Sequence, residues 1–399
     1  MDRDVYVDSV GRALQAFPVV AVLGPRQCGK TTLARMCAAR IASRPFCSFD
    51  LEDPTDLVRL EDPKLALQDL QGLVVVDEIQ RVPGLFKVLR VLADRPKNPA
   101  RFLILGSASP DLIRQSSETL AGRICFIELT PFQISEAGFE NSTRLWVRGG
   151  FPRSYLARSD AQSLVWRRAF ISSFLERDIP NLGIRIPSRS MRRFWMMLAH
   201  CHGQLLNASE LGRSLGIADT TVRRYLDILT GTFMIRQLTP WYENISKRQV
   251  KAPKIYFRDS GILHAFLALE SYEVLRAHPK LGASWEGFAL EEILRALKIE
   301  QEEAFFWSSH GQAELDLLVV RGSRRIGYEV KYTSRPAVTK AMRIAIEDLK
   351  LERLDIVYAG QECFPLAGNV RAISLCQLLR EAQRGGFRGR GRATEDSRH

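Results

Sequence analysis

A glycine-rich stretch near the N-terminus has the residue types that hold a polyphosphate. The segment AVLGPRQCGKTT matches the pattern G-x-x-x-x-G-K-[ST] and follows an apolar run typical of a strand. Backbone N–H groups in such a loop curl around phosphate oxygens, and the dipole of the following helix favours their negative charge. Lys30 would reach the β- and γ-phosphates, and Thr31 would hold Mg²⁺. We therefore expect ATP or GTP to contact the loop residues Gly24, Pro25, Arg26, Gln27, Cys28, Gly29, Lys30, Thr31 and Thr32.

The segment LVVVDEIQ supplies a second part of the same site. Its apolar strand ends in Asp77 and Glu78. Asp77 would contact Mg²⁺ through water, and Glu78 would polarise the attacking water. A later apolar run, RFLILGS, ends in Ser107, whose hydroxyl would touch the γ-phosphate. These residues predict ATP hydrolysis with ATP and Mg²⁺ as cofactors, and with Lys30 and Glu78 as catalytic groups.

The segment ELDLLVVRGSRRIGYEVK, nearer the C-terminus, places charges inside two apolar strands. If its Gly-Ser pair is a two-residue turn, Asp316 lies opposite Glu329, and Glu314 lies opposite Lys331. Two adjacent carboxylates repel each other unless a cation lies between them, and Mg²⁺ is the usual cation. We therefore expect a metal site at Asp316 and Glu329, with Lys331 stabilising developing charge. The alternative is a plain cross-strand ion pair between Glu314 and Lys331 without a metal.

The elements that position these residues follow from periodicity. Residues 1–140 alternate near-continuous apolar runs with helical stretches, which predicts a mostly parallel α/β sheet with helices on both faces. Residues 141–197 are predicted to form a helical lid or connector, and residues 198–258 a winged helix-turn-helix. Residues 259–380 return to helix and strand. The Gly/Arg-rich residues 381–399 cannot bury enough apolar surface to order, which predicts a disordered tail.

The helix-turn-helix prediction rests on NASELGRSLGIADTTVRRYLDILTG, where a glycine turn separates two short amphipathic helices. The second helix would present Arg223 and Arg224, and the following basic loop, with Lys247, Arg248 and Lys251, would be a wing that contacts phosphates. The formal charge of +12 and the pI near 9.5 favour a polyanionic partner, most simply DNA. The alternative is that this segment only packs against the first domain.

Length and composition limit the class of protein. A chain of 399 residues is long enough for roughly two to four domains. It has 46% hydrophobic and 26% charged residues, as soluble globular proteins do. No run of about 18 consecutive apolar residues occurs, and no signal-like segment opens the chain, so a cytoplasmic protein without a membrane span is expected. The seven cysteines form no CxxC pair, which argues against disulfides and zinc.

Beyond the strand that ends in Ser107, the chain resembles AAA+ ATPases, in which a polar sensor lies beside the Walker motifs. In that superfamily an arginine after the sensor strand reaches the nucleotide of a neighbouring subunit. Arg123, in LAGRI, matches that place, with Arg114 as the alternative. Serine stands where AAA+ proteins commonly have Asn as the sensor. The resemblance implies an arginine that stabilises phosphoryl charge across subunits, and hence a ring, such as a hexamer, or another homo-oligomer.

The segments GPRQCGKTT, LVVVDEIQ, LAGRI and GGFPRSYLA together resemble a family of poorly characterised prokaryotic ATPases. That family pairs an AAA-type domain with a winged helix and a C-terminal nuclease-like domain of unknown function. In related ATPases a Gly-x-Pro motif lies near the adenine; Gly150 and Pro152 match it, and Arg153 would be a second sensor. The Asp…Glu-x-Lys arrangement of the hairpin resembles the PD-(D/E)XK nuclease fold, in which Glu286 matches an upstream helical acid.

These expectations leave three functions open. The leading hypothesis is an ATP-hydrolysing protein that binds or remodels DNA, branched DNA included. The second is a nucleotide-dependent regulatory switch that acts on a protein partner. The third is an ATP-regulated, Mg²⁺-dependent DNA endonuclease. ATP turnover stimulated by DNA would favour the first, turnover indifferent to DNA the second, and nicking lost in Asp316→Ala the third.

Overall fold

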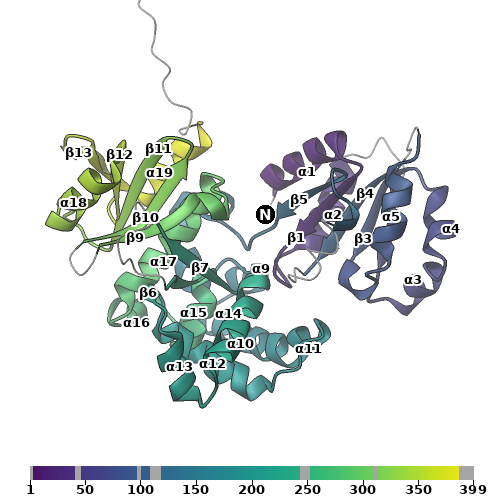
Figure 1. Cartoon of the computed structure of the whole chain (residues 1–399), viewed down its shortest axis with the longest axis horizontal. Helices are drawn as coiled ribbons and strands as arrows, with labels where there is room; N and C mark the ends of the chain where they lie inside the picture. Colours follow the sequence, from purple (N-terminus) through teal and green to yellow (C-terminus); the bar gives the residue numbers. More distant parts are fainter. Residues whose placement is uncertain are drawn as a thin grey trace, which may run out of the picture. The chain divides into compact units, whose positions relative to one another are not determined.

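The computed structural model describes residues 3–40, 46–96, 100–107, 118–242, 252–309 and 313–385 (Figure 1). The chain divides into two compact units, each made of discontinuous segments. The first unit comprises Met1–Glu136, Gly149–Arg193 and Ile217–Ile235, and the second comprises Ala137–Arg148, Phe194–Gly216 and Arg236–His399. The N-terminal sheet therefore shares its unit with two segments that follow much later in the sequence.

A parallel sheet of five strands forms the centre of the first unit. Its strand order is β2-β3-β4-β1-β5, and every neighbouring pair is parallel. The strands are β1 (Val19–Leu23), β2 (Phe46–Asp50), β3 (Gly72–Asp77), β4 (Ala100–Gly106) and β5 (Ile124–Glu128). Parallel strands place all their carboxyl ends at one edge, so the residues that follow β1, β2, β3 and β4 gather there.

Helices cover both faces of this sheet. On one face, α1 (Asp4–Ala16) and α2 (Lys30–Arg40) pack on Val20 and Val22. On the other, α4 (Pro63–Gln68) and α5 (Leu85–Ala93) pack on Val19, Ala21 and Leu23. Successive strand residues point to opposite faces, which is why the run VVAVL is apolar throughout. The predicted parallel α/β sheet covered on both faces is confirmed.

The remaining elements of the first unit are helical. A five-residue π-helix, η3 (Phe174–Asp178), continues the long helix α10 (Asp160–Ser173) without a break. Such π-helical insertions are rare and often occur at functional sites. The other short elements are α3 (Pro54–Arg59), η1 (Ile79–Arg81), α9 (Pro152–Tyr155), α11 (Ile179–Asn181) and α14 (Asp219–Gly231). Helix α12 (Ser188–His200) runs from the first unit into the second.

The second unit contains a mixed sheet with the order β13-β14-β12-β11-β10-β9-β7-β8-β6. Its strands are β6 (Gln204–Leu205), β7 (Ile235–Pro240), β8 (Lys254–Phe257), β9 (Ala304–Ser308), β10 (Glu314–Arg321), β11 (Arg324–Lys331), β12 (Arg353–Tyr358), β13 (Cys363–Ala367) and β14 (Val370–Ser374). Its helices are α7 (Ile134–Ala137, across the boundary of the units), η2 (Phe139–Asn141), α8 (Ser142–Arg148), α13 (Ala208–Leu215), α15 (Ser260–Phe266), α16 (Tyr272–Arg276), α17 (Leu281–Ala296), η4 (Gln301–Glu303), α18 (Lys340–Leu349) and α19 (Leu375–Gln383).

The hairpin of β10 and β11 has the register that the sequence predicted. Leu317 pairs with Tyr328, and Arg321 pairs with Arg324. Between them Gly322 has a φ of +59°, a conformation that glycine adopts without strain. Helix α18 packs on one side of the hairpin through Met342 and Ala345, while α17 contacts β11. The next rung beyond Leu317 and Tyr328 therefore brings Asp316 beside Glu329.

The predicted winged helix spans the boundary between the two units. Its first helix, α13, ends at Gly216, which has a φ of +69°, and its second helix, α14, begins at Asp219. The helices and the glycine turn occur where they were predicted, but α13 belongs to the second unit and α14 to the first. The wing residues Lys247, Arg248 and Lys251 lie outside the described residues, as do residues 386–399 of the predicted tail.

None of the helices in the described part of the chain is both long enough and apolar enough to span a bilayer.

Candidate functional site

The phosphate loop connects β1 to α2 at the carboxyl edge of the sheet. Two of its glycines are needed for different reasons. Gly29 has a φ of +101°, a backbone conformation that residues other than glycine rarely adopt. At Gly24 a Cβ atom would overlap the carbonyl oxygen of Leu129, so the backbone passes too close to β5 for any side chain. The backbone path of the loop therefore requires glycine at both positions.

Arg3 supports this loop from behind. Its side chain is buried and donates to the carbonyl oxygen of Cys28 at 3.0 Å and to that of Thr130 at 2.7 Å. It also pairs with Glu136 at 2.7 Å. Arg3 could not be predicted from the sequence, because nothing near the N-terminus indicates that this residue reaches a loop 25 positions away.

Lys30 and Thr31 lie where the loop meets α2. The Lys30 ammonium donates to the carbonyl oxygens of Gly24 and Pro25 at 3.1 and 3.0 Å. Thr31 Oγ1 donates to Asp77 Oδ2 at 2.6 Å. The two predicted Mg²⁺ contacts, which are 46 residues apart in the chain, are therefore neighbours. A hydroxyl and a carboxylate side by side are oxygen donors that suit Mg²⁺.

Glu78 follows Asp77 in a left-handed conformation, with a φ of +54°. For a residue other than glycine this costs roughly 1–2 kcal/mol, and such strain tends to collect at functional sites. The Glu78 carboxylate accepts a hydrogen bond from the Gln80 side chain. Burial raises the pKa of Glu78 above its ordinary value, although Lys30 and Arg26 oppose this. A carboxylate with a raised pKa is better suited to accept a proton from water.

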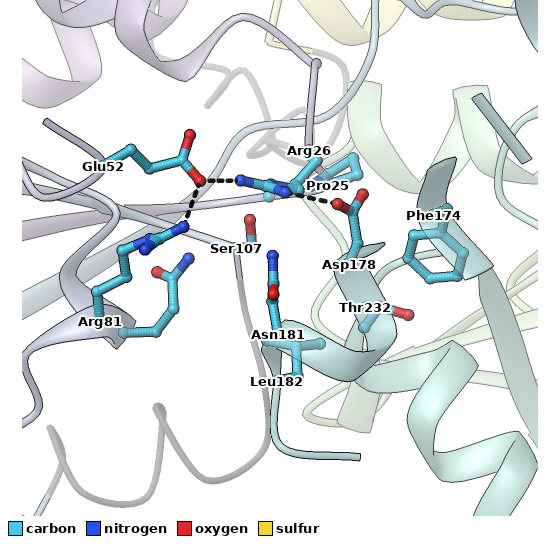
Figure 2. A pocket seen from close by; sticks show the side chains of 12 residues that line it. Pro25, Arg26, Glu52, Arg81, Ser107, Phe174, Asp178, Asn181, Leu182 and Thr232 are labelled. Atoms are coloured by element: carbon cyan, nitrogen blue, oxygen red, sulfur yellow. Dashed lines mark hydrogen bonds and ion pairs between the residues drawn. The ribbon is translucent and has the colours of Figure 1, made fainter. Parts of the chain in front are cut away.

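A pocket of about 130 Å³ opens beside the loop (Figure 2). Its volume is below the roughly 300 Å³ usual for a whole ligand of drug size, so it suits a phosphate-sized group. Ser107 is buried in its wall, and its hydroxyl has no hydrogen-bond partner among the described residues. The lining residues are Gly24, Pro25, Arg26, Glu52, Gln80, Arg81, Ser107, Phe174, Asp178, Asn181, Leu182 and Thr232.

Arg26 joins the two sides of this pocket. Figure 2 shows its guanidinium between Glu52 and Asp178, each 2.5 Å away, and Glu78 lies 4.0 Å from its Nε. Burial lowers the pKa of Arg26, but the carboxylates more than offset this, and the net pKa is raised. The pKa of Glu52 is lowered: its partial burial would raise this pKa, but the charges of Arg26 and Arg81 outweigh the burial.

From the sequence, Arg26 was expected only to contact phosphate as part of the loop. Glu52, Asp178 and Asn181 were not predicted to lie at this site. Glu52 follows β2 at the carboxyl edge of the sheet, so its position could have suggested a place at the site. Asp178 and Asn181 carry no comparable signal.

Three other predicted residues lie away from the pocket. Pro152 begins α9, and neither it nor Arg153 is among the lining residues. Arg123 precedes β5, whose Ile124 pairs with Val19 at the amino end of β1. It therefore lies at the opposite edge of the sheet from the loop of its own chain, with its guanidinium 2.5 Å from Asp94. A contact of Arg123 with nucleotide would have to reach a neighbouring subunit, and this role stays a prediction. Arg114 lies outside the described residues.

The second candidate site is the carboxylate cluster of the hairpin. Lys331 lies 2.9 Å from Glu329 and 3.8 Å from Asp316, and the N–H of Val330 donates to Asp316 Oδ2 at 2.9 Å. Burial, with the charge of Asp316, raises the pKa of Glu329 to about 8. The same two causes raise the pKa of Glu286 on α17 to about 7. The predicted convergence of these acids is thus observed in the structure.

A buried lysine, which the sequence analysis missed, lies inside this cluster. The Lys254 side chain is 4% exposed; its ammonium contacts Glu314 and lies 3.7 Å from both Glu286 and Asp316. Burial opposes a charged amine, but the three carboxylates raise the pKa of Lys254 and keep it protonated. An ammonium group therefore lies 3.7 Å from Asp316, one of the two carboxylates predicted to bind Mg²⁺. Glu314 pairs with Lys254 and not with Lys331. The alternative prediction, a plain cross-strand ion pair between Glu314 and Lys331, is therefore not observed.

Within the described ranges, no three His, Cys, Asp or Glu side chains form a group arranged to hold a metal. The Mg²⁺ assignment to Asp316 and Glu329 stays a prediction. Arg223 and Arg224 are exposed on α14, as expected for residues that would contact a partner.

Family models match nearly the whole chain. Residues 16–138 match an AAA domain. Residues 140–273 and 281–378 match two domains of unknown function, DUF8612 and DUF4143. The chain is also 52% identical over 368 residues to an uncharacterized protein of Mycobacterium tuberculosis strain H37Rv, Rv2008c, and to its counterpart in Mycobacterium bovis. The match covers 92% of this chain and 82% of each relative.

Solved structures show weaker similarity. The Walker-type ATPase of Pyrococcus abyssi is 14% identical, with a TM-score of 0.48, over 67% of this chain and 95% of the other. The RuvB Holliday junction branch migration motor of Thermotoga maritima is 17% identical, with a TM-score of 0.30, over 59% and 90%. Similarities at this level carry no argument about substrates or partners.

Proposed function

This chain belongs to the family of the mycobacterial protein Rv2008c, and we propose that it is an ATPase that couples ATP hydrolysis to binding or remodelling of DNA. The observation that carries the ATPase part is the 2.6 Å hydrogen bond between Thr31 and Asp77. It brings a phosphate loop and a strand-end carboxylate together within a domain that matches the AAA model.

The chemistry assigns one task to each group. The loop N–H groups and Lys30 hold the β- and γ-phosphates, so Lys30 exchanges the carbonyls of Gly24 and Pro25 for phosphate oxygens. Thr31 and Asp77 would hold Mg²⁺, which would offset phosphate charge. Glu78 accepts the proton of the attacking water, and Ser107 donates to the γ-phosphate. In an oligomer, Arg123 would leave Asp94 to contact the nucleotide of a neighbouring subunit.

Support for DNA as the partner is electrostatic. The chain has a net charge of +12, and Arg223 and Arg224 are exposed on a helix that follows a glycine turn. A helix-turn-helix of this kind, within a winged helix, would contact DNA mainly through phosphates and would select structure more than sequence.

The second unit would then be a DNA-binding domain of the PD-(D/E)XK type without nuclease activity. The Asp316, Glu329 and Lys331 arrangement on its hairpin supports the fold assignment. Lys254 argues against cleavage, since its buried ammonium already lies 3.7 Å from Asp316 and from Glu286, two of the carboxylates that a metal would need. The endonuclease function is therefore the least favoured of the three.

A nucleotide-dependent switch acting on a protein partner is the second candidate. One observation favours it: Arg26 ties the phosphate loop to Asp178, outside the AAA sheet. A change at the γ-phosphate would therefore be transmitted to the π-helix that ends in Asp178.

Steady-state ATP hydrolysis with Mg²⁺ tests these functions. The protein is assayed alone and with single-stranded, duplex and four-way-junction DNA, with Lys30→Ala and Glu78→Gln as inactive controls. Severalfold stimulation by one DNA form supports the DNA-coupled ATPase. Turnover that is unchanged by all three forms moves the assignment to the switch, and wild-type turnover equal to that of Lys30→Ala overturns the ATPase itself.

A further inference from the structure

The loop side chain Arg26 forms ion pairs with carboxylates from three separate segments. Glu52 follows β2, Glu78 follows β3, and Asp178 ends the π-helix η3. The Arg26 side chain is 18% exposed and lines the pocket. A cation held by three acids in the wall of a phosphate-sized pocket is placed to change partners when a phosphate arrives.

The charges at the pocket make such an exchange necessary. Glu52 and Asp178 both line it, and a γ-phosphate entering beside them would be repelled unless a cation intervened. Lys30 contacts the carbonyl oxygens of Gly24 and Pro25 and is not among the residues that line the pocket, whereas Arg26 is. Arg26 has a planar fork of N–H donors that matches phosphate oxygens as well as it matches carboxylates.

We propose that Arg26 distinguishes ATP from ADP by exchanging its contact with Asp178 for the γ-phosphate of ATP. The inference rests on the proposed ATP binding and deepens it by naming the residue that reads the third phosphate. ADP leaves the Arg26–Asp178 ion pair in place, because it brings no oxygen to this end of the pocket. ATP breaks the pair, and Asp178 and the π-helix then lose their tie to the loop.

Binding of ADP and of the non-hydrolysable analogue β,γ-methylene-ATP to the full-length protein, with Mg²⁺, tests this by calorimetry. In Arg26→Gln the affinity for the analogue falls by about tenfold or more, as expected for loss of a charge-assisted hydrogen bond, while the ADP affinity changes less than about twofold. Asp178→Asn binds the analogue more tightly than wild type, since less must be displaced. Arg40→Gln, the same charge change on an exposed residue paired with Asp4, leaves both affinities unchanged.

A second measurement is independent of affinity. Hydrogen exchange in residues 174–181 is faster with the analogue than with ADP in the wild type, and the two ligands give equal rates in Arg26→Gln. Equal loss of both affinities in Arg26→Gln, or no loss of either, overturns the role of Arg26 while ATP binding stands. If the folded wild-type protein binds neither ligand, the proposed ATPase function fails, and the role of Arg26 fails with it.

Discussion

Replacing Lys254 with Met should destabilise the second unit strongly. Met keeps most of the aliphatic length of the side chain but removes the ammonium that lies 3.7 Å from both Glu286 and Asp316 and contacts Glu314. Removing one partner of a buried ion pair typically costs about 3–5 kcal/mol, because the opposite charge stays buried without compensation. Two other groups of the cluster remain in the variant: Lys331, and Tyr256, which donates a hydrogen bond to Glu286 at 2.5 Å. We therefore expect the free energy of unfolding to fall by about 3 kcal/mol, the lower end of this range.

The loss should grow with pH. Glu286 already has a pKa of about 7 in the folded chain, above its value in an unfolded chain, and loss of Lys254 raises it further. The folded state then holds a proton that the unfolded state has released. Stability from such a group is complete below the unfolded pKa and is lost as pH rises through the folded one. Below about pH 7 both folded proteins hold this proton, so the difference between variant and wild type stays constant there. Above about pH 7 only the variant holds it, and the difference should widen by up to about 1.4 kcal/mol per pH unit until the variant's own folded pKa is passed.

Urea unfolding followed by tryptophan fluorescence measures this loss. Trp146, Trp195, Trp241, Trp285 and Trp307 lie in the second unit, so the signal reports mainly on the unit that contains Lys254. Lys340→Met, which removes an exposed lysine of the same unit, is the matched control and should stay within about 0.5 kcal/mol of wild type.

Two results would refute the reasoning. One is a loss below about 1 kcal/mol in Lys254→Met, which would mean that the ammonium does not neutralise the cluster. The other comes from adding about 10 mM Mg²⁺, which should stabilise Lys254→Met, with its uncompensated acids, and leave the wild type unchanged. Stabilisation of the wild type would show that a metal, and not Lys254, belongs in the cluster.

Three further predictions concern the loop and the core. Gly24→Ala should cost about 1–3 kcal/mol because its Cβ meets the Leu129 carbonyl, whereas Gly84→Ala, with open space around it, should cost no more than about 0.5 kcal/mol; both are measured by urea unfolding followed by circular dichroism, which includes the first unit. Thr31→Ala should raise the Mg²⁺ concentration needed for half-maximal ATP turnover severalfold, and an unchanged requirement would remove Thr31 from the metal site. Burial lowers the pKa of His202 to about 3. The free energy of unfolding should therefore fall as pH drops below about 6.5, by up to about 1.4 kcal/mol per pH unit. His202→Gln should flatten this pH dependence, and an unaltered slope in the variant would contradict the role of His202.

The features that could be predicted from the sequence are those encoded by short, contiguous spacing. The phosphate loop needs two glycines, a lysine and a threonine within a few residues, and a strand must precede it. Asp77 and Ser107 could be placed because parallel strands bring their carboxyl ends to one edge. The hairpin register that puts Asp316 beside Glu329 followed from a two-residue turn and the alternation of strand residues. Each of these is local geometry or a rule of sheet topology.

Only the tertiary structure decided which partners the charges find. Arg26 and Asp178 are 152 positions apart, and no pattern near either residue links the phosphate loop to the end of a π-helix. Lys254 looks in the sequence like one more basic residue of an exposed wing, yet β8 brings it among three acids that are far from it in the chain. Hydrophobic periodicity predicts which residues are buried. It does not predict which opposite charge will offset the free-energy cost of burying a charged side chain, because that partner is brought near only by tertiary packing. That choice is made when the segments come together, and here it places the Lys254 ammonium beside Glu286, Glu314 and Asp316.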